Sequence, residues 1–337
     1  MVPLTAIFCL SSRFYGENDF TIEKKNFVCY NIINEYLAGE IFMRKKLAAV
    51  LAALLALLTF CLCACKDVPK SGEYDINAGV TGARGDIEFT VVSYNLHSGG
   101  ATQEMMDKAR EQIDASGADI AGLQEVDRDG SGRAGDKMIS TLTSGAMKEY
   151  FFAPTMSYYF GEDYGIMTAS RHKMESSFSL FLPYPYEHMT LFNSTIEPRV
   201  VTRSLITING VQVAAYNTHL DYTGTTMPDG TLLRLAQMQF VYELMLSDPC
   251  PYQILTGDFN AGGWDDFAVF MNSDKYAPAS TPENPVASFF TDGDQNKPAY
   301  IDNVIYSKNT LTLEEVFNTQ SDLSDHLMLT AKFKTIA

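Results

Sequence analysis

Six short stretches of this sequence combine carboxylates, amides and three histidines, each at the end of an expected β-strand. They are Ser93–His97, Gln124–Asp127, Asn217–Asp221, Gly257–Asn260, Tyr300–Asn303 and Ser324–His326. Together they supply oxygen ligands for a hard divalent cation, amide donors and imidazoles that exchange protons near neutral pH. Such a set is suited to the hydrolysis of phosphate esters.

The candidate metal ligands are Asn95, Glu125 and Asp325. Glu125 directly follows the apolar run 120–123, and Asn95 ends the strand 89–94, so both are expected where a strand leaves the core. A carboxylate beside an amide oxygen suits Mg²⁺, or Mn²⁺ in its place, because Mg²⁺ prefers oxygen ligands and keeps several waters. Taken singly, each residue is better explained as a turn or cap, so the prediction depends on the set.

A base and the carboxylate that orients it are suggested by His326 and Asp302. Histidine has an ordinary pKa of about 6.5, which lets it accept a proton from water, and a neighbouring carboxylate fixes its tautomer. His219 ends the strand 211–218 and is a candidate donor to a phosphoryl oxygen. A lone histidine is more often a partly buried packing residue, but three of the five histidines, His97, His219 and His326, fall in these strand-end stretches.

Asp258 and Asn260 alternate around Phe259 after Gly257. Because successive side chains of an extended chain point to opposite sides, both polar residues can face one site while Phe259 turns to the core. A tight turn of the Asx type is the structural alternative for the same residues.

The elements that must position these residues mix strands and helices. Strands are expected over 89–94, 120–123, 200–208, 211–216, 252–256, 302–307, 311–317 and 327–333, and helices over 103–115 and 231–247. Asn209-Gly210 is a strong hairpin signal, so the strands on either side of it are expected to be antiparallel. Hairpins mixed with strand–helix–strand units predict an α/β fold of mixed sheets with helices outside.

Composition indicates a globular, acidic protein. Of its 337 residues 46% are hydrophobic, and residues 66–337 alone carry 19 basic and 36 acidic side chains, a formal charge of -17. This charge disfavours nucleic acid as a partner, because phosphate-backbone binding draws most of its affinity from Lys and Arg. With no internal repeat or second linker, residues 87–335 are expected to form one domain, and we expect a monomer.

The N-terminal region has the pattern of an export signal. Arg44-Lys45-Lys46 precedes 18 uncharged residues, 47–64, and Leu62-Cys63-Ala64-Cys65 resembles a bacterial lipobox in which Cys65 is lipidated. The alternative is an uncleaved membrane-spanning helix. We therefore predict an upstream extension at 1–42, a signal peptide at 43–65 and a flexible tether at 66–86, with the domain held at the outer face of the bacterial cytoplasmic membrane.

The six stretches, taken in order, resemble the endonuclease/exonuclease/phosphatase superfamily over about residues 87–335. The resemblance implies an α/β four-layered sandwich of two mixed β-sheets packed face to face and flanked by helices. It implies Mg²⁺ on Asn95 and Glu125 with Asp325 nearby, and it implies that Asp258 and Asn260 position water and phosphate. It also implies that His326, oriented by Asp302, activates the nucleophile or stabilises the transition state, and that His219 holds a phosphoryl oxygen.

Two further site residues follow from the resemblance alone. Tyr164 is similar to the family's tyrosine before its middle strand, and Arg199 is similar to its phosphate-side arginine, with Arg203 as an alternative. Arg234 and Gln237 after the His219 strand resemble the sphingomyelinase-like branch, although a solvated helix face explains them equally well.

Three hypotheses follow for the function. The first is an exported, membrane-anchored, Mg²⁺-dependent phosphodiesterase or phosphatase that acts on a small-molecule or lipid-linked phosphate ester. The second is a secreted or surface nuclease of the same fold, whose activity would fall steeply with salt. The third is a catalytically silent binding domain, which is disfavoured because every member of the catalytic set is present.

Overall fold

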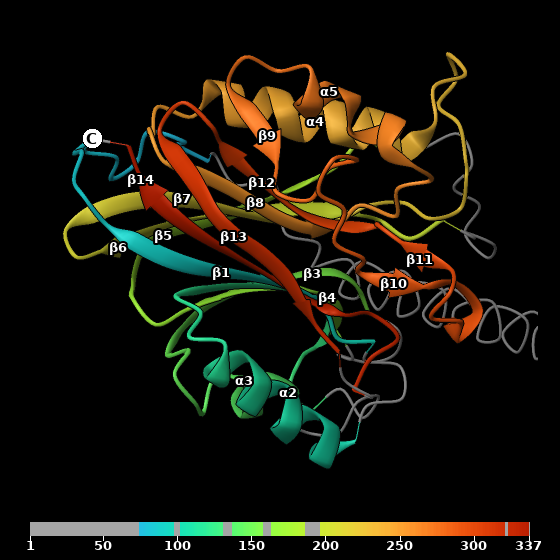
Figure 1. Cartoon of the computed structure of the whole chain (residues 1–337), viewed down its shortest axis with the longest axis horizontal. Coiled ribbons are helices and arrows are strands. Elements are labelled where there is room, and N and C mark those ends of the chain that lie inside the picture. The colour runs from blue at the N-terminus through green and yellow to red at the C-terminus, as the bar shows by residue number, and fades with distance from the viewer. Residues whose placement is uncertain are drawn as a thin grey trace, which may run out of the picture. The chain divides into compact units, whose positions relative to one another are not determined.

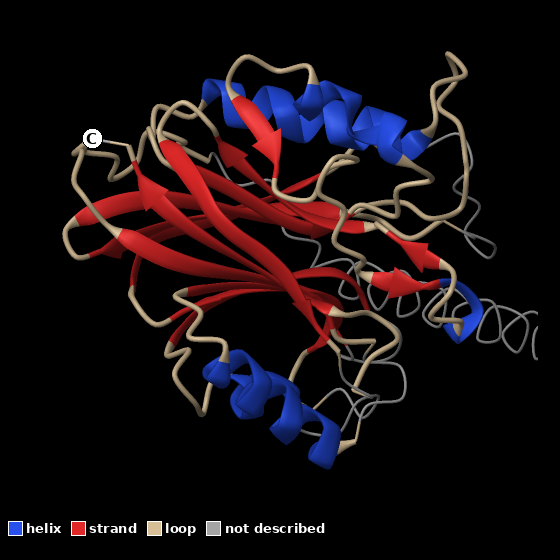
Figure 2. Cartoon of the chain, viewed as in Figure 1, coloured by secondary structure: helices blue, strands red, loops and turns tan. Residues whose placement is uncertain are grey.

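The computed structural model describes residues 74–97, 102–130, 137–157, 163–185, 196–320 and 323–336. In this part of the chain, two six-stranded mixed sheets pack face to face, and helices cover the outer face of each (Figures 1 and 2). The expected α/β four-layered sandwich is therefore confirmed. The predicted extension, the signal peptide and the lipidation residue Cys65 lie outside the described residues.

The first sheet has the strand order β13-β14-β1-β2-β4-β3 and the second has the order β5-β6-β7-β8-β12-β9. The strands of the first sheet are β1 (Glu88–Asn95), β2 (Ile120–Asp127), β3 (Glu149–Ser157), β4 (Asp163–Ser170), β13 (Leu311–Thr319) and β14 (Met328–Thr335). Those of the second are β5 (Lys173–Phe181), β6 (Val200–Ile208), β7 (Val211–His219), β8 (Gln253–Asp258), β9 (Tyr276–Pro278) and β12 (Asp302–Ser307).

The remaining elements are short except for two helices. The helices are α2 (Gln103–Ala115), α3 (Met138–Leu142), α4 (Leu233–Ser247) and α5 (Ala268–Met271), with 3-10 turns η5 (Trp264–Phe267) and η6 (Thr291–Gly293). A two-stranded ribbon is formed by β10 (Phe289–Phe290) and β11 (Pro298–Ala299). In Figure 1, α2 and α3 cover the first sheet and α4 and α5 cover the second.

Strand alternation divides the apolar side chains between the layers. On β1, Phe89 and Val91 pack between the two sheets, whereas Val92 and Tyr94 pack against α2 and α3. A third buried cluster lies between the second sheet and α4. This two-sided burial explains why the central strands are almost continuously apolar rather than half polar.

Helix α2 forms where its sequence predicts it. The Thr102 hydroxyl accepts a hydrogen bond from the Met105 backbone N–H at 3.3 Å, which caps the N-terminus. Met106, Ala109 and Ile113 form the buried stripe that packs on the first sheet. The expected hairpin is also confirmed, because β6 and β7 pair antiparallel on either side of Asn209-Gly210.

Strand direction brings the six strand ends to one edge. β1 runs parallel to β2, and β7 runs parallel to β8, so the C-terminal ends of each pair meet. β12 and β14 run antiparallel to β8 and β1, so their N-terminal ends lie at the same edge. The chemistry of the six stretches is therefore gathered by topology and not by nearness in the sequence.

Six strands were not expected from periodicity, namely β3, β4, β5 and the short strands β9, β10 and β11. β3 contains Pro154 and has a register shift against β4 at that residue, a combination that an edge strand tolerates. β5 reads Lys-Met-Glu-Ser-Ser-Phe-Ser-Leu-Phe, and it also carries a register shift against β6. Polar runs and bulges of this kind hide the period of two that identifies a strand.

Residues 74–86, expected as the second half of the flexible tether, instead pack on the second sheet. Ile76 and Val80 lie against the cluster beside α4. The Thr81 backbone N–H donates to the Gln212 side-chain oxygen at 2.7 Å. The tether prediction is corrected for these residues, because apolar side chains and a buried glutamine hold them to the domain.

Within the residues that the structure describes, no helix is long and apolar enough to cross a membrane.

Candidate active site

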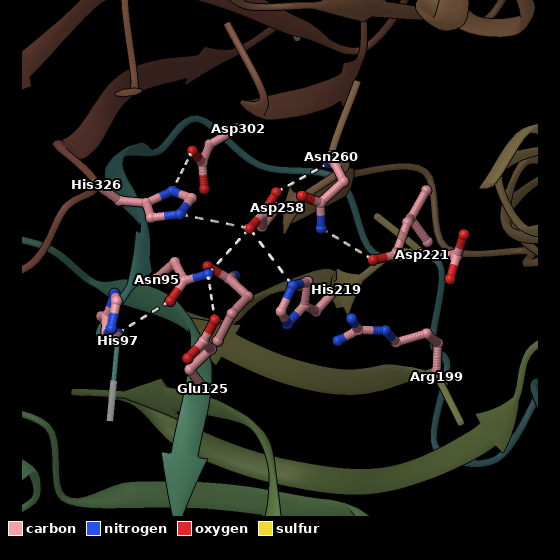
Figure 3. Close-up of polar contacts among 12 residues, drawn as sticks. Asn95, His97, Glu125, Arg199, His219, Asp221, Asp258, Asn260, Asp302 and His326 are labelled. Atoms are coloured by element: carbon pink, nitrogen blue, oxygen red, sulfur yellow. Dashed lines mark hydrogen bonds and ion pairs between the residues drawn. The ribbon is translucent and has the colours of Figure 1, made fainter. Parts of the chain in front are cut away.

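The strand-end residues converge on Asp258, at the C-terminal end of β8 (Figure 3). Its carboxylate oxygen Oδ2 lies 2.9 Å from Asn95 Nδ2, 3.5 Å from His219 Nε2 and 3.7 Å from His326 Nε2. The side chains come from β1, β7, β8 and the start of β14, so both sheets contribute to one site. All four are at least 94% buried.

Asn95 links the carboxylates of Asp258 and Glu125. Its Nδ2 donates to Glu125 Oε1 at 3.3 Å as well as to Asp258, and its Oδ1 accepts the His97 backbone N–H at 3.0 Å. An amide oxygen has two acceptor sites, so one remains for a further partner. Asn95 therefore fixes the spacing between the two carboxylates.

His326 and Asp302 form the expected pair. His326 Nδ1 lies 2.8 Å from Asp302 Oδ2, and both side chains are buried. Burial alone would lower the pKa of His326, but the carboxylates of Asp302 and Asp258 outweigh it and raise that pKa to about 10. The imidazole is therefore a cation at neutral pH, and its Nε2 side faces Asp258 (Figure 3).

The carboxyl group of Asp258 is poised to exchange a proton. Burial, and then the negative charge of Asp302, raise its pKa from 3.8 to about 7, although His326 and hydrogen bonds from Asn260 and Asn95 oppose the rise. A carboxylate with a pKa near the working pH is an effective general base.

His219 has the opposite character to His326. Burial, with Arg199 and then His326 adding repulsion, lowers the pKa of His219 well below its ordinary value. A neutral imidazole in this position donates from one ring nitrogen and accepts at the other. His219 and His326 therefore approach Asp258 in different protonation states.

Asn260 is held in an unusual backbone conformation. Its φ is 48°, in the left-handed region, and its backbone N–H donates to Asp258 Oδ1 at 2.9 Å. The side-chain Nδ2 donates to the Leu220 carbonyl at 3.0 Å, and Phe259 is buried in the core. The Asx turn considered as an alternative is thus present, and Asp258 and Asn260 lie side by side at the site (Figure 3).

The structure separates the two candidate arginines. Arg203 is fully buried beside Asp248, with Nε 3.1 Å from Asp248 Oδ2 and Nη2 3.3 Å from Oδ1, so it is a structural residue of the second sheet. The guanidinium of Arg199 points toward His219 (Figure 3) and lies 3.1 Å from Glu197 and 5.9 Å from the Tyr222 ring. Arg199 is 2% exposed, and its Nε has no partner among the described residues.

Two expected site residues have other surroundings. Asp325 pairs with His97, with 2.7 Å between Asp325 Oδ1 and His97 Nδ1, and both are about half exposed at the rim. Tyr164 is buried on β4, opposite Asp127 in the β2–β4 register. The negative charge of Asp325 nonetheless contributes to the raised pKa of His326.

Gln237 and Arg234, which a solvated helix face could have explained, are both engaged. Gln237 is fully buried, and its Oε1 accepts the Asp221 backbone N–H at 2.9 Å. Arg234 Nε lies 2.7 Å from Asp266 Oδ2. These residues hold the loops that follow β7 and β8 and so support His219 and Asn260 from outside.

The donor set fits a hard divalent cation at Glu125. Glu125 offers a carboxylate, and Asn95 offers the free acceptor site of its oxygen, both of which suit Mg²⁺. Ligand atoms of Asp258, Asp302 and His326 also lie within 4.8 Å of one another. We favour Glu125 with Asn95, because His326 and Asp302 are already hydrogen-bonded to each other and an imidazole is a poor ligand for Mg²⁺.

Sequence reasoning missed His97 and Asn217 as site residues. His97 has a φ of 46° and contacts both Asn95 and Asp325. Asn217 is fully buried between the sheets and contacts three residues of the first sheet. Both lie inside the quoted stretches, but nothing in their identity indicates which partners the fold brings to them.

Comparisons with known proteins agree with the observed fold. The Endonuclease/Exonuclease/phosphatase family model matches residues 92–326. A solved endonuclease/exonuclease/phosphatase structure from Beutenbergia cavernae is 16% identical, with a TM-score of 0.59 over 74% of this chain and 72% of that one. One from Bacteroides vulgatus is 15% identical, with a TM-score of 0.58 over 74% and 100%.

The human Nocturnin catalytic domain, solved with a bound sulfate anion, is 19% identical, with a TM-score of 0.54 over 74% of this chain and 94% of that one. At such identities the structural likeness shows a shared fold. No curated protein matches the sequence significantly.

Proposed function

Because the chain belongs to the endonuclease/exonuclease/phosphatase family, whose members are metal-dependent hydrolases of phosphoric esters, we propose that it is a Mg²⁺-dependent phosphodiesterase or phosphatase. The observation that carries the proposal is the position of Asp258. It lies between a cationic His326 and a neutral His219, and Asn95 connects it to the Glu125 carboxylate.

The pKa directions favour Asp258 as the group that accepts a proton from the attacking water. A water molecule beside Asp258 loses its proton to this carboxylate, whose pKa of about 7 matches a neutral working pH. For His326 the sequence leaves two roles open, activation of the nucleophile and stabilisation of the transition state, and we propose the second. Its pKa of about 10 makes it a cation that stabilises the charge developing on the phosphoryl oxygens.

The other residues bind and orient the ester. His219, neutral and buried, donates to a phosphoryl oxygen, and the guanidinium of Arg199, whose Nε has no partner among the described residues, points toward His219. Asn260 holds the water or the phosphate beside Asp258 through its amide. Mg²⁺ held by Glu125 with Asn95 would polarise the phosphoryl group and screen its charge from the nucleophile.

A small-molecule or lipid-linked phosphate ester is the proposed substrate class. The domain is strongly acidic, and a nucleic acid would meet that charge over many phosphates. A single phosphate meets only the local cations, Arg199 and His326. The Tyr222 ring, 60% exposed beside Arg199, offers an apolar surface to the alcohol side of such an ester.

The test is a panel of esters with the purified protein and Mg²⁺. A chromogenic phosphodiester and lipid, sugar, nucleotide and inositol phosphates would be compared with single-stranded and duplex DNA. We expect turnover of small or lipid-linked esters with little dependence on salt. Faster cleavage of DNA, with a rate that falls steeply as salt rises, would favour the nuclease alternative.

We also propose that the protein is a lipoprotein held at the outer face of the cytoplasmic membrane. The proposal rests on the basic cluster 44–46, the apolar run 47–64 and Cys65 in the sequence. Cys65→Ser is expected to abolish labelling by a radioactive fatty acid and to release the protein from the membrane. A mutant retained in the membrane would support a spanning helix instead.

A further inference from the structure

The direction of Glu125 depends on an irregularity in β2. Leu123 and Val126 both pack in the cluster beside α2 and α3, while Gln124 faces the second sheet. In a regular strand, Glu125 would lie on the face of Leu123 and point away from the site. Instead it accepts a hydrogen bond from Asn95, whose side chain lies between the sheets.

A β-bulge makes this possible. Leu123 pairs with Met167 of β4, but Val126 pairs with Gly165, so the register shifts by one residue. Glu125 adopts a φ of 54°, in the left-handed region that is costly for a residue with a side chain. A bulge leaves one residue unpaired and turns its side chain, which here aims the candidate metal ligand at the site.

One side chain of the opposite sheet holds the backbone next to this bulge. Asn217 Nδ2 donates to the Leu123 carbonyl at 3.0 Å and to the Met167 carbonyl at 3.1 Å. Leu123 and Met167 are the last regular pair before the register shifts. Asn217 thus binds both strands at the point where the bulge begins.

The oxygen of the same amide contacts Gln124, a residue of the bulge itself. Asn217 Oδ1 accepts a hydrogen bond from Gln124 Nε2 at 2.7 Å. It also lies 3.2 Å from Thr256 Oγ1, whose single proton is shared with the Tyr216 carbonyl at 3.1 Å. Both N–H donors and the oxygen of the Asn217 amide therefore have partners, and the side chain is fully buried. A fully satisfied buried amide specifies one arrangement of its partners.

We infer that Asn217 is a positioning residue for the metal ligand Glu125. It fixes the bulge in β2 from the opposite sheet, and the bulge fixes the direction of the Glu125 carboxylate. The inference rests on the proposed function, because it takes Glu125 as the ligand of the divalent cation. It also means that β7 serves the site twice, through His219 at its end and through Asn217 two residues earlier.

The chemistry of the amide explains why even the similar side chain of aspartate at position 217 should weaken metal binding. Asn217→Asp keeps the shape but replaces two N–H donors with acceptors that face two carbonyl oxygens. The repulsion is relieved when the backbone of Leu123 or Met167 moves, and the bulge moves with it. Loss of an outer contact of this kind typically weakens metal binding by about 10- to 100-fold.

The experiment measures Mn²⁺ binding to the purified protein by electron paramagnetic resonance, without substrate. We expect Asn217→Asp to raise the Mn²⁺ dissociation constant by about 10- to 100-fold. The control is Thr168→Val, which removes the buried contact between Thr168 Oγ1 and Thr202 Oγ1, 3.0 Å long, from the same layer between the sheets. This control should bind Mn²⁺ like the wild type.

A second variant covers the case in which Asn217→Asp does not fold. Gln124→Met keeps the volume but removes the donor to Asn217 Oδ1, and we expect weaker Mn²⁺ binding here too. Wild-type Mn²⁺ affinity in a folded Asn217→Asp protein, or in Gln124→Met where that protein is unfolded, would overturn the positioning role. A wild-type protein that binds no Mn²⁺ would overturn the metal site of the proposed function, and the inference with it.

Discussion

Replacing Asp302 with asparagine tests how the site sets its protonation states. Asp302 raises the pKa of His326 both by its charge and through the hydrogen bond at 2.8 Å, while burial of the imidazole acts in the opposite sense. Without the Asp302 charge, only the other carboxylates, chiefly Asp258, oppose the effect of burial, and we expect the pKa of His326 to fall from about 10 toward its ordinary value of about 6.5.

The consequence for activity follows from the fraction of protonated imidazole. At pH 8 a histidine with a pKa of 10 is almost fully charged, whereas one with a pKa of 6.5 is about 3% charged, which predicts a loss of up to about 30-fold in kcat/KM. Asp302 also raises the pKa of Asp258, so that pKa should fall in the same variant. The window between the two pKa values should therefore move to lower pH as a whole.

The assay is a pH–rate profile of kcat/KM together with an NMR titration of the histidine rings. The wild type should gain activity as pH rises through about 7 and lose it through about 10. His172, paired with Asp119 at 2.7 Å outside the site, is the internal control, and its ring signals should be the same in both proteins. An unchanged basic limb in Asp302→Asn, with an unshifted His326 resonance, would refute the reasoning.

The same pKa shifts predict how stability depends on pH. The raised pKa of His326, about 10, stabilises the folded state fully below about pH 6.5, and this contribution is lost as pH rises toward 10. In urea unfolding, the free energy of unfolding of His326→Gln should therefore depend less on pH over that range than that of the wild type. An unchanged pH dependence would contradict the prediction. Arg203→Met leaves Asp248 buried without its cation, so it should lower the free energy of unfolding by about 3 to 5 kcal/mol while turnover at low temperature survives; a wild-type urea midpoint would contradict the structural role. A Cβ at Gly122 would lie 1.8 Å from Thr256 Oγ1, so Gly122→Ala should destabilise by about 1 to 3 kcal/mol, and Thr256→Ala in the same chain should recover part of the loss; no recovery would mean that this contact is not the cause.

The sequence predicts the central part of the fold well. The strands and helices with strong periodicity, such as 103–115 and the hairpin around Asn209-Gly210, are found at their expected places. Edge strands could not be predicted in the same way, because β3 contains Pro154 and both β3 and β5 carry bulges that break the alternation. Their pairing depends on neighbours that are distant in the chain.

The site, like the fold, has features that the sequence predicts and features that depend on distant neighbours. That Asp258, Asn95 and His326 share one place follows from strand ends and from the order of the stretches. The choice of Arg199 over Arg203 could not be predicted, because both are arginines at the start of one strand. Only the fold shows that Arg203 meets Asp248, whereas Arg199 points toward His219.

Protonation could not be predicted from the sequence at all. A histidine and an aspartate in a motif suggest a base and its partner, which is how His326 and Asp302 were first interpreted. The pKa directions depend on how deeply each group is buried and on which charges surround it. These quantities are the basis on which we propose Asp258 as the proton acceptor and His326 as the cation.

The most direct measurement of the central claim is the turnover of a chromogenic phosphodiester by Asp258→Asn. Asparagine keeps the shape and the hydrogen bond from the Asn260 N–H but cannot take a proton from water. The account predicts that wild-type turnover needs Mg²⁺ or Mn²⁺ and stops in excess chelator, and that the folded variant still binds Mn²⁺ but loses nearly all turnover. Full activity of Asp258→Asn, or of the wild type in excess chelator, would contradict it.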